Sequence, residues 1–257
     1  MKIKGTLKYL FLILLAAAAV WAIISFVRIP PDYDTATDAQ KKVLNYAKAN
    51  GLSYTDYPES LIALLERNPE TEKFVLEYPI ASKETAAIDL SEYENCETVP
   101  LFLQWDQRWG YMKYGSDVAG LTACGPVCLS MAAYYLTKDP AYSPDKMIRF
   151  ASENGYYVSG SGSSWTLISE GGVKLGFDVT EIPLDENRIR KNLEAGNPII
   201  CAMGPGDFTA TGHYIVLVGY EDGKLRVNDP NSHANSDTLW AYADIEKQFR
   251  NLWVIRK

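Results

Sequence analysis

Residues 126–138 are apolar on almost every side of the helix that their spacing predicts. A helix on the surface of a domain carries a polar stripe, whereas a helix that is apolar all round lies buried inside one. The rest of the domain must therefore pack around this segment, and we expect it to be the central helix of the fold. Its apolar positions are Val127, Cys128, Leu129, Met131, Ala132, Ala133 and Leu136.

The elements expected after this helix indicate the fold class. Residues 155–172 are rich in Gly and Ser, which predicts a surface loop around a cleft. A helix is expected at 186–195, and strand-like runs separated by turn signals follow it. Helices first and antiparallel strands after them predict an α+β fold, with the central helix packed on an antiparallel sheet. The expected strands are 199–203, 214–220, 225–229 and 252–255.

Residues 9–27 form an apolar run that only Ser25 interrupts, with three Lys residues before it and Arg28 after it. At about 1.5 Å per residue a helix of this length covers about 28 Å, close to the thickness of the hydrocarbon layer of a membrane. We therefore expect a single membrane helix, with a cytoplasmic N-terminus and an extracellular remainder because the basic residues precede the run. Cleavage as a signal peptide, at the small residues 16–19, stays open as the alternative, and it would give a secreted protein.

The chain is expected to divide into three parts: residues 1–28 with the anchor, a spacer and small helical leader over 29–98, and a catalytic unit over 99–257. In the leader, helical spacing and Pro or Gly breaks predict helices at 38–50, 58–67 and 70–77, followed by a linker over 80–98.

Composition excludes several classes of function. Lys and Arg number 25 against 32 Asp and Glu, so a net charge of −7 gives no general attraction to nucleic acid. The four cysteines form no CxxC pair, and the two histidines form no HExxH motif. We expect no metal site and no cofactor.

Cys124 stands immediately before the central helix, in the string Ala123-Cys124-Gly125-Pro126. The free N–H groups and the dipole of a helix N-terminus stabilise a thiolate, which makes this position suited to a nucleophile. Cys128 lies inside the apolar helix and fits ordinary packing.

His213 opens the strongest strand signal, and Asp229 ends the next strand after a hairpin turn at 221–223. Antiparallel pairing brings these two ends back together, so a carboxylate lies near the imidazole. Asn228 stays open as an alternative partner, although alternation places Asp229 on the apolar face of its strand. His233 lies in a polar loop and is expected to be solvated. A disulfide between Cys96 and Cys201 is left open.

These residues resemble the papain-fold cysteine peptidases of the bacteriocin-processing type, cysteine-peptidase family thirty-nine, in its stand-alone branch. The resemblance rests on Cys-Gly-Pro at 124–126, Gly-His-Tyr at 212–214 and Asn-Asp-Pro at 228–230, in this order, with Val-Pro at 99–100 and a Gln-Trp string at 104–109 upstream. It extends to the leader strings between residues 57 and 79.

The resemblance implies a papain-like fold and a role for each of four residues. Cys124 would be the nucleophile, His213 the base, Asp229 the residue that orients the imidazole, and Gln104 the donor to the oxyanion. Gln107 is the fallback for the last role. The chain carries no ATP-binding P-loop, so the coupled export performed by the family's transporters is not implied.

The predicted function is that of a membrane-anchored, extracellular bacterial cysteine peptidase or amide hydrolase. Its partners would be a peptide or other amide substrate and, through residues 9–27, the membrane. Two alternatives stay open: an inactive module on the same fold that binds peptides or cell-wall fragments, and an acyl transferase. The sequence does not define the substrate, the oligomeric state, or whether the leader inhibits the enzyme or only spaces it from the membrane.

Overall fold

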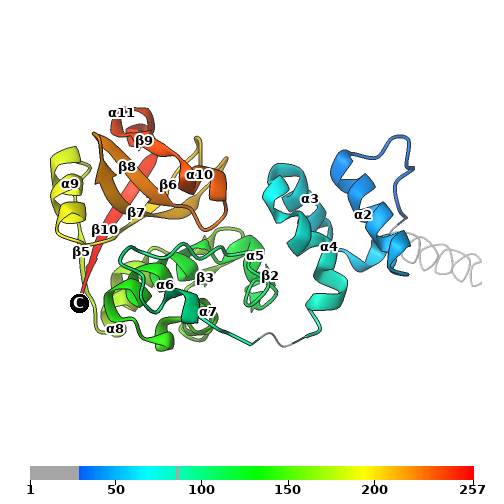
Figure 1. Ribbon diagram of the computed structural model, residues 1–257, viewed down its shortest axis with the longest axis horizontal. Helices are drawn as coiled ribbons and strands as arrows, with labels where there is room; N and C mark the ends of the chain where they lie inside the picture. Colours follow the sequence, from blue (N-terminus) through cyan, green and yellow to red (C-terminus); the bar gives the residue numbers. More distant parts are fainter. Residues whose placement is uncertain (1–28, 85–86) are drawn as a thin grey trace, which may run out of the picture.

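An antiparallel sheet of six strands forms one half of the C-terminal unit, residues 99–257, in the computed structural model, which describes residues 29–84 and 87–257 (Figure 1). The strand order is β5-β10-β6-β7-β8-β9, and each pairing in this sheet is antiparallel. The strands are β5 Asp178–Glu181, β6 Ile199–Met203, β7 His213–Glu221, β8 Lys224–Asn228, β9 Leu239–Ala241 and β10 Phe249–Arg256.

Alternation along the strands divides the interior into two layers. On β7, Tyr214 and Val216 join the hydrophobic cluster that contains helix α6 (Cys124–Thr137). Ile215 and Leu217 belong to a second cluster on the opposite face, which α9 (Glu186–Glu194) and α11 (Tyr242–Ile245) cover. Successive side chains of a strand point to opposite faces, so a sheet with apolar residues on both faces needs a cover on each side.

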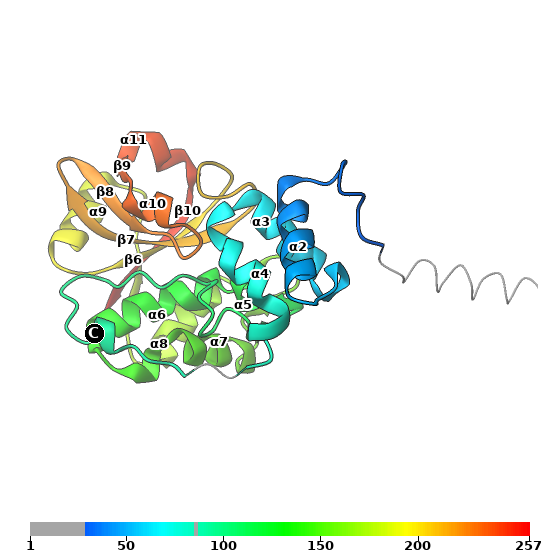
Figure 2. The same ribbon diagram turned by 45° about the vertical axis from the view of Figure 1, so that its right-hand side comes forward.

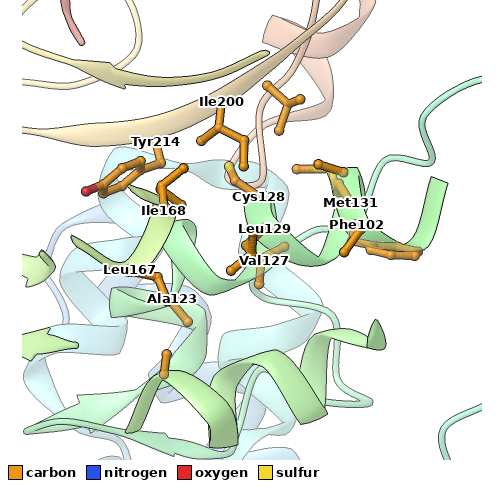
Figure 3. Packing of buried hydrophobic residues seen from close by; sticks show 14 of the residues in the cluster. Phe102, Ala123, Val127, Cys128, Leu129, Met131, Leu167, Ile168, Ile200 and Tyr214 are labelled. Carbon is orange, nitrogen blue, oxygen red and sulfur yellow. The ribbon is translucent and has the colours of Figure 1, made fainter. Parts of the chain in front are cut away.

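Helix α6 is the buried centre of the C-terminal unit, as predicted. Its residues 125–134 are all buried, and Figure 3 shows Cys128 and Met131 on the side of α6 that faces the sheet. The helix begins at Cys124, which places Pro126 in the first turn. Proline is tolerated there, because the backbone N–H groups of the first turn have no partner within the helix. It ends at Thr137, where Lys138 turns to a φ of 57°. The predicted α+β architecture, a buried helix on an antiparallel sheet, is confirmed.

A helical half packs on the other side of α6, below the sheet in Figure 1. It contains α5 (Ala119–Thr122), α7 (Pro144–Glu153) and α8 (Gly172–Lys174). Two short hairpins accompany them, formed by β1 Lys113–Tyr114 with β2 Asp117–Val118, and by β3 Tyr157–Val158 with β4 Gly162–Ser163. Short 3₁₀ helices lie at Tyr54–Asp56, Pro69–Thr71, Ser91–Tyr93, Pro140–Tyr142 and Glu246–Gln248, and α10 spans His233–Asp237.

The predicted surface loop at 155–172 is only partly correct. Its first part forms the β3–β4 hairpin, but Leu167–Gly171 is a π-helical turn that leads directly into α8. Leu167 and Ile168 are fully buried in the central cluster. These two side chains fix the segment to the core, although its Gly and Ser content indicates a surface loop.

The leader consists of three helices with a hydrophobic cluster of their own: α2 (Asp38–Ala49), α3 (Glu59–Arg67) and α4 (Glu72–Ala81). The first two agree with prediction. The third was wrongly predicted to stop before Pro79, because the helix includes Pro79 in its last turn. Pro79 lacks an N–H and so removes one hydrogen bond of the helix, and the residue is buried.

The leader packs directly against the C-terminal unit, and both views place it beside the α5 region (Figures 1 and 2). The Phe74 ring stacks on Tyr111 with a centroid distance of 4.5 Å. A Cβ added to Gly110 or Gly120 would lie 2.8 or 2.5 Å from the Phe74 ring. Glycine at these two positions therefore permits the close approach of the ring.

In the segment predicted as a linker, residues 80–98, several of the described residues contact the rest of the fold. Leu90 is buried in the central cluster, and Lys138 Nζ donates to the carbonyl of Cys96 at 2.5 Å and contacts its sulfur at 3.0 Å. Cys96 and Cys201 are both free thiols, and Cys201 is buried in β6. The disulfide left open from the sequence is therefore absent.

Within the part of the chain that the structure describes, none of the helices has both the length and the apolar character needed to cross a lipid bilayer. The membrane helix expected at 9–27 lies outside the described residues.

The packing of the leader on the C-terminal unit predicts that Phe74→Ala strongly lowers the free energy of unfolding. Phe74 is 2% exposed, and truncation of such a buried ring costs about 3–5 kcal/mol of the free energy of unfolding. Ile80→Ala in the same helix is the matched control, because Ile80 is 44% exposed and a surface change costs within about 0.5 kcal/mol. Urea unfolding measures both variants, and equal free energies would contradict the packing.

Candidate active site

Cys124 is the first residue of α6, and no side chain caps this end of the helix. The free N–H groups of the first turn and the positive end of the helix dipole therefore lie beside the thiol. Gly125 is required next to it, since a Cβ there would lie 2.8 Å from the side chain of Ser163 in β4. The Cys-Gly-Pro string thus starts the helix, admits the β3–β4 hairpin and leaves the sulfur half-buried.

His213 and Asp229 meet where β7 begins and β8 ends, as predicted. His213 Nε2 donates to Asp229 Oδ1 at 2.7 Å. The amide of Asn228, the residue before Asp229, donates instead to the carbonyls of Val99 and Pro100. The open alternative of Asn228 as the partner of His213 is therefore wrong.

Asp229 is 1% exposed and is held by donors from its own loop. The backbone N–H of Asn231 donates to Oδ1 at 2.8 Å, and the Asn235 amide donates to Oδ2 at 2.7 Å. The backbone N–H of Asp229 donates to Ser236 Oγ at 2.9 Å. A buried carboxylate needs such donors to remain ionised. Sequence reasoning missed Asn235 and Ser236, because nothing distinguishes them from ordinary polar loop residues.

The environment of His213 favours its charged form. Burial lowers the pKa of the ring, but the charge and hydrogen bond of Asp229 and the pairing with the Cys124 sulfur outweigh burial and raise the pKa to about 10. Because Nε2 is bonded to Asp229, the other ring nitrogen is the one that serves the sulfur. The three residues therefore form a chain from carboxylate to imidazole to thiol.

Two of the other three cysteines, Cys128 and Cys201, have a different environment. Burial raises the pKa of Cys128 and of Cys201 well above the usual range for a thiol. A thiol that stays protonated and enclosed is a poor nucleophile. Cys124 is the half-buried thiol next to an imidazole, which separates it chemically from Cys128 and Cys201.

A cleft of about 380 Å³ opens above Cys124 and His213. The β3–β4 hairpin forms one wall, and Trp165, which is 50% exposed, also lines the cleft. The segments 202–205 and 211–214 line the cleft, and Arg250 adds a cationic group. Its other lining residues are Val158, Ser161, Ser163 and Ser164.

Gln104 is buried beside the residues that flank the site. Its backbone N–H donates to the carbonyl of Pro230, and its amide Nε2 donates to the carbonyl of Gly120 at 2.8 Å. Gln104 thus links the loop after Asp229 to the turn before Cys124. Gln107 does not lie at the site, because its amide bonds Glu77 of the leader and the hydroxyl of Tyr111.

The second histidine lies apart from the cleft. His233 is exposed, and its ring lies edge-on to Trp105 with a centroid distance of 5.8 Å. Among residues 29–84 and 87–257, no cluster of three or more His, Cys, Asp or Glu side chains is arranged to hold a metal ion.

We predict that Asp229→Asn lowers the pKa of His213, since it removes the negative charge and keeps the burial. In the wild type the raised pKa means that charged His213 stabilises the fold fully below about 6.5, the unfolded value, and that this contribution is lost as the pH rises through about 10. In the variant the loss occurs at a lower pH. The chain has two histidines, so NMR of labelled histidine resolves each titration.

The matched control for this prediction is Asp237→Asn, an exposed aspartate near the other end of the same loop. The titration of His213 is expected to stay as in the wild type there. An unchanged titration in Asp229→Asn would contradict the coupling of the two groups.

Comparisons with known proteins gave two kinds of match, to solved structures and to a family model. Among solved structures, the peptidase domain of Streptococcus ComA, described as a bifunctional ABC transporter involved in quorum sensing, is 19% identical with a TM-score of 0.44, covering 62% of this chain and 98% of that one. A Bacillus anthracis protein described as a C39-like peptidase is 15% identical with a TM-score of 0.43, covering 64% of this chain and 96% of that one. No curated protein matches the chain. The model of the Peptidase_C39 like family matches residues 96–257, well over half of the chain, and the protein therefore belongs to this family.

Proposed function

We propose that the protein is a cysteine peptidase or related amide hydrolase that acts through Cys124, His213 and Asp229. The observation that carries the proposal is the chain from the Asp229 carboxylate through His213 to the sulfur at the start of α6. Membership of the Peptidase_C39 like family supports it. The 380 Å³ cleft above the sulfur supports a peptide or another extended amide as the substrate.

The reaction follows from these positions. The Cys124 thiolate attacks the substrate carbonyl, and a tetrahedral oxyanion forms. The His213 imidazolium then gives its proton to the leaving amine, which breaks the C–N bond and leaves an acyl thioester on Cys124. Water next attacks the thioester and gives a proton to His213, which breaks the C–S bond, releases the acid and restores the Cys124 thiolate and the His213 imidazolium. Asp229 stabilises the imidazolium and fixes its orientation throughout.

Gln104 is our candidate for an oxyanion donor, together with the backbone N–H of Cys124. One N–H of its amide is bonded to the Gly120 carbonyl, which fixes the group and leaves the second N–H for an oxyanion. Gln104 Oε1 is buried and has no hydrogen-bond partner among the described residues. An unpaired buried acceptor costs about 1–3 kcal/mol, a cost that proteins tend to carry at functional sites.

The proposal predicts selective chemistry at Cys124. Brief alkylation of the full-length protein at pH 5–6, followed by mass spectrometry, should label Cys124 and spare the buried Cys128 and Cys201. His213→Ala should slow the labelling of Cys124 at least about tenfold, because the thiolate loses its cationic partner. Labelling of Cys124 that starts only near pH 8.5 would contradict a catalytic thiol.

A peptide library completes the test, because it separates hydrolysis from the alternatives. Cleavage by wild type that is abolished in Cys124→Ala and retained in Cys128→Ala establishes the hydrolase. Capture of an added amine in place of water identifies an acyl transferase. Binding without any cleavage identifies a binding module and refutes the proposed activity.

We also propose that residues 9–27 anchor the protein in the membrane with the catalytic unit outside the cell. The support is the apolar run and the position of the Lys residues before it. The protein should stay in the membrane fraction after alkaline carbonate washing, and protease added to intact protoplasts should degrade the catalytic unit. Release of the protein by carbonate contradicts the anchor, and release of a shortened chain into the medium identifies a cleaved signal peptide.

A further inference from the structure

The leader contacts the loop that carries Asp229. Among the described residues, none of those that line the cleft above Cys124 comes from the leader. Residues 229–237 instead lie on the side of the sheet that faces α3, as both views show through the position of α10 (Figures 1 and 2). The leader is thus placed to act on the catalytic carboxylate without covering the cleft.

Glu70 of the leader makes three hydrogen bonds to this loop. Its Oε1 accepts from Ser232 Oγ at 2.8 Å and from the N–H of Ala234 at 3.3 Å, and its Oε2 accepts from the N–H of His233 at 2.7 Å. Hydrogen bonds to an ionised carboxylate are stronger than those between neutral groups. One leader side chain therefore fixes the backbone of the loop at two successive residues.

Asn68 makes a second attachment from the same leader turn. Its amide Nδ2 donates to the carbonyl of Asn231 at 2.5 Å, and Trp105 Nε1 donates to the same carbonyl at 3.0 Å. The N–H of Asn231 in turn donates to Asp229 Oδ1. The carbonyl of Asn231 thus binds the leader, while the N–H of the same residue binds the carboxylate of Asp229.

The loop transmits these attachments to Asp229 over a few residues. Ser232 Oγ, which donates to Glu70, also accepts the N–H of Asn235, and the Asn235 amide donates to Asp229 Oδ2. Two groups of the loop donate to the carboxylate of Asp229, the N–H of Asn231 and the side-chain amide of Asn235. Each of these two residues is linked to a leader side chain through at most two hydrogen bonds.

We propose that Asn68 and Glu70 are positioning residues for Asp229, so that the leader completes the active site and does not inhibit it. The inference rests on the proposed function of Asp229. Without these two side chains the loop backbone bonds water instead, and the donors of Asp229 lose their fixed geometry. Asp229 then holds His213 less firmly, and the thiolate at Cys124 loses its partner.

The experiment uses the full-length chain in mild detergent, with Glu70→Gln, Glu70→Ala and Asn68→Ala. Glu72→Gln is the matched control, because Glu72 lies two residues further along the leader and bonds Lys42 within it. Histidine NMR gives the titration of His213, and the same signals report the state of the loop through His233, whose N–H bonds Glu70. The alkylation rate of Cys124 is followed from pH 5 to 9 in each variant.

We expect the His213 titration to move down by about one pH unit in Glu70→Gln and further in Glu70→Ala. Alkylation of Cys124 at pH 6 should fall about tenfold in these variants and in Asn68→Ala, while Glu72→Gln stays as wild type. Should Glu70→Ala not fold, Glu70→Gln and Asn68→Ala decide the question. The inference is overturned if both fold, the His233 signal moves, and the titration of His213 and the alkylation of Cys124 are unchanged.

The outcome is separable from the fate of the proposed function. If wild type cleaves no peptide while His213 still shifts in the Glu70 variants, the proposed function fails and the positioning role stands. If wild type cleaves peptides and the Glu70 and Asn68 variants keep its titration and alkylation profile, only the positioning role fails. Faster alkylation or cleavage in these variants would instead identify the leader as an inhibitor.

Discussion

The burial of α6 against the sheet is the constraint on which the rest of the structure depends. A helix with no polar face is stable only when other elements enclose it, and here the sheet and the helical half do so together. This packing brings the N-terminus of α6 to the point where β7 starts and β8 ends. Cys124 therefore meets His213 and Asp229 as a consequence of the way in which the hydrophobic core is closed.

The site then depends on keeping charge in a place from which water is largely excluded. Burial alone would favour a neutral His213, and Asp229 reverses this preference. Asp229 in turn needs donors, which come from Asn231 and Asn235 of its own loop. The loop is attached to the leader through Glu70. The charge state of His213 thus depends, through a series of hydrogen bonds, on the leader, which lies outside the cleft.

Much of this arrangement was predictable from the sequence, because apolar residues recur at the spacing of a helix or a strand. The central helix, the two strands of the hairpin and the pairing of His213 with Asp229 follow from apolar spacing and from one turn signal. The predictions failed where the sequence pattern was weak or misleading. The edge strands β5 and β9 span only four and three residues, too few for an alternating pattern to stand out, and α7 was missed although Ser143-Pro144 marks its start. Pro79 suggested a helix end that packing overrides.

The sequence by itself determined the fold class, the thiol at a helix N-terminus and the imidazole with its carboxylate, because each depends on residues close together in the chain. Tertiary structure alone decided which groups surround them. Only the tertiary structure shows that the side chain of Gln107 binds Glu77 of the leader and that Asn228 binds the carbonyls of Val99 and Pro100. It also shows that Glu70 binds the loop after Asp229. These contacts join residues far apart in the chain, and no local pattern encodes them, since they arise only when separate hydrophobic clusters pack together.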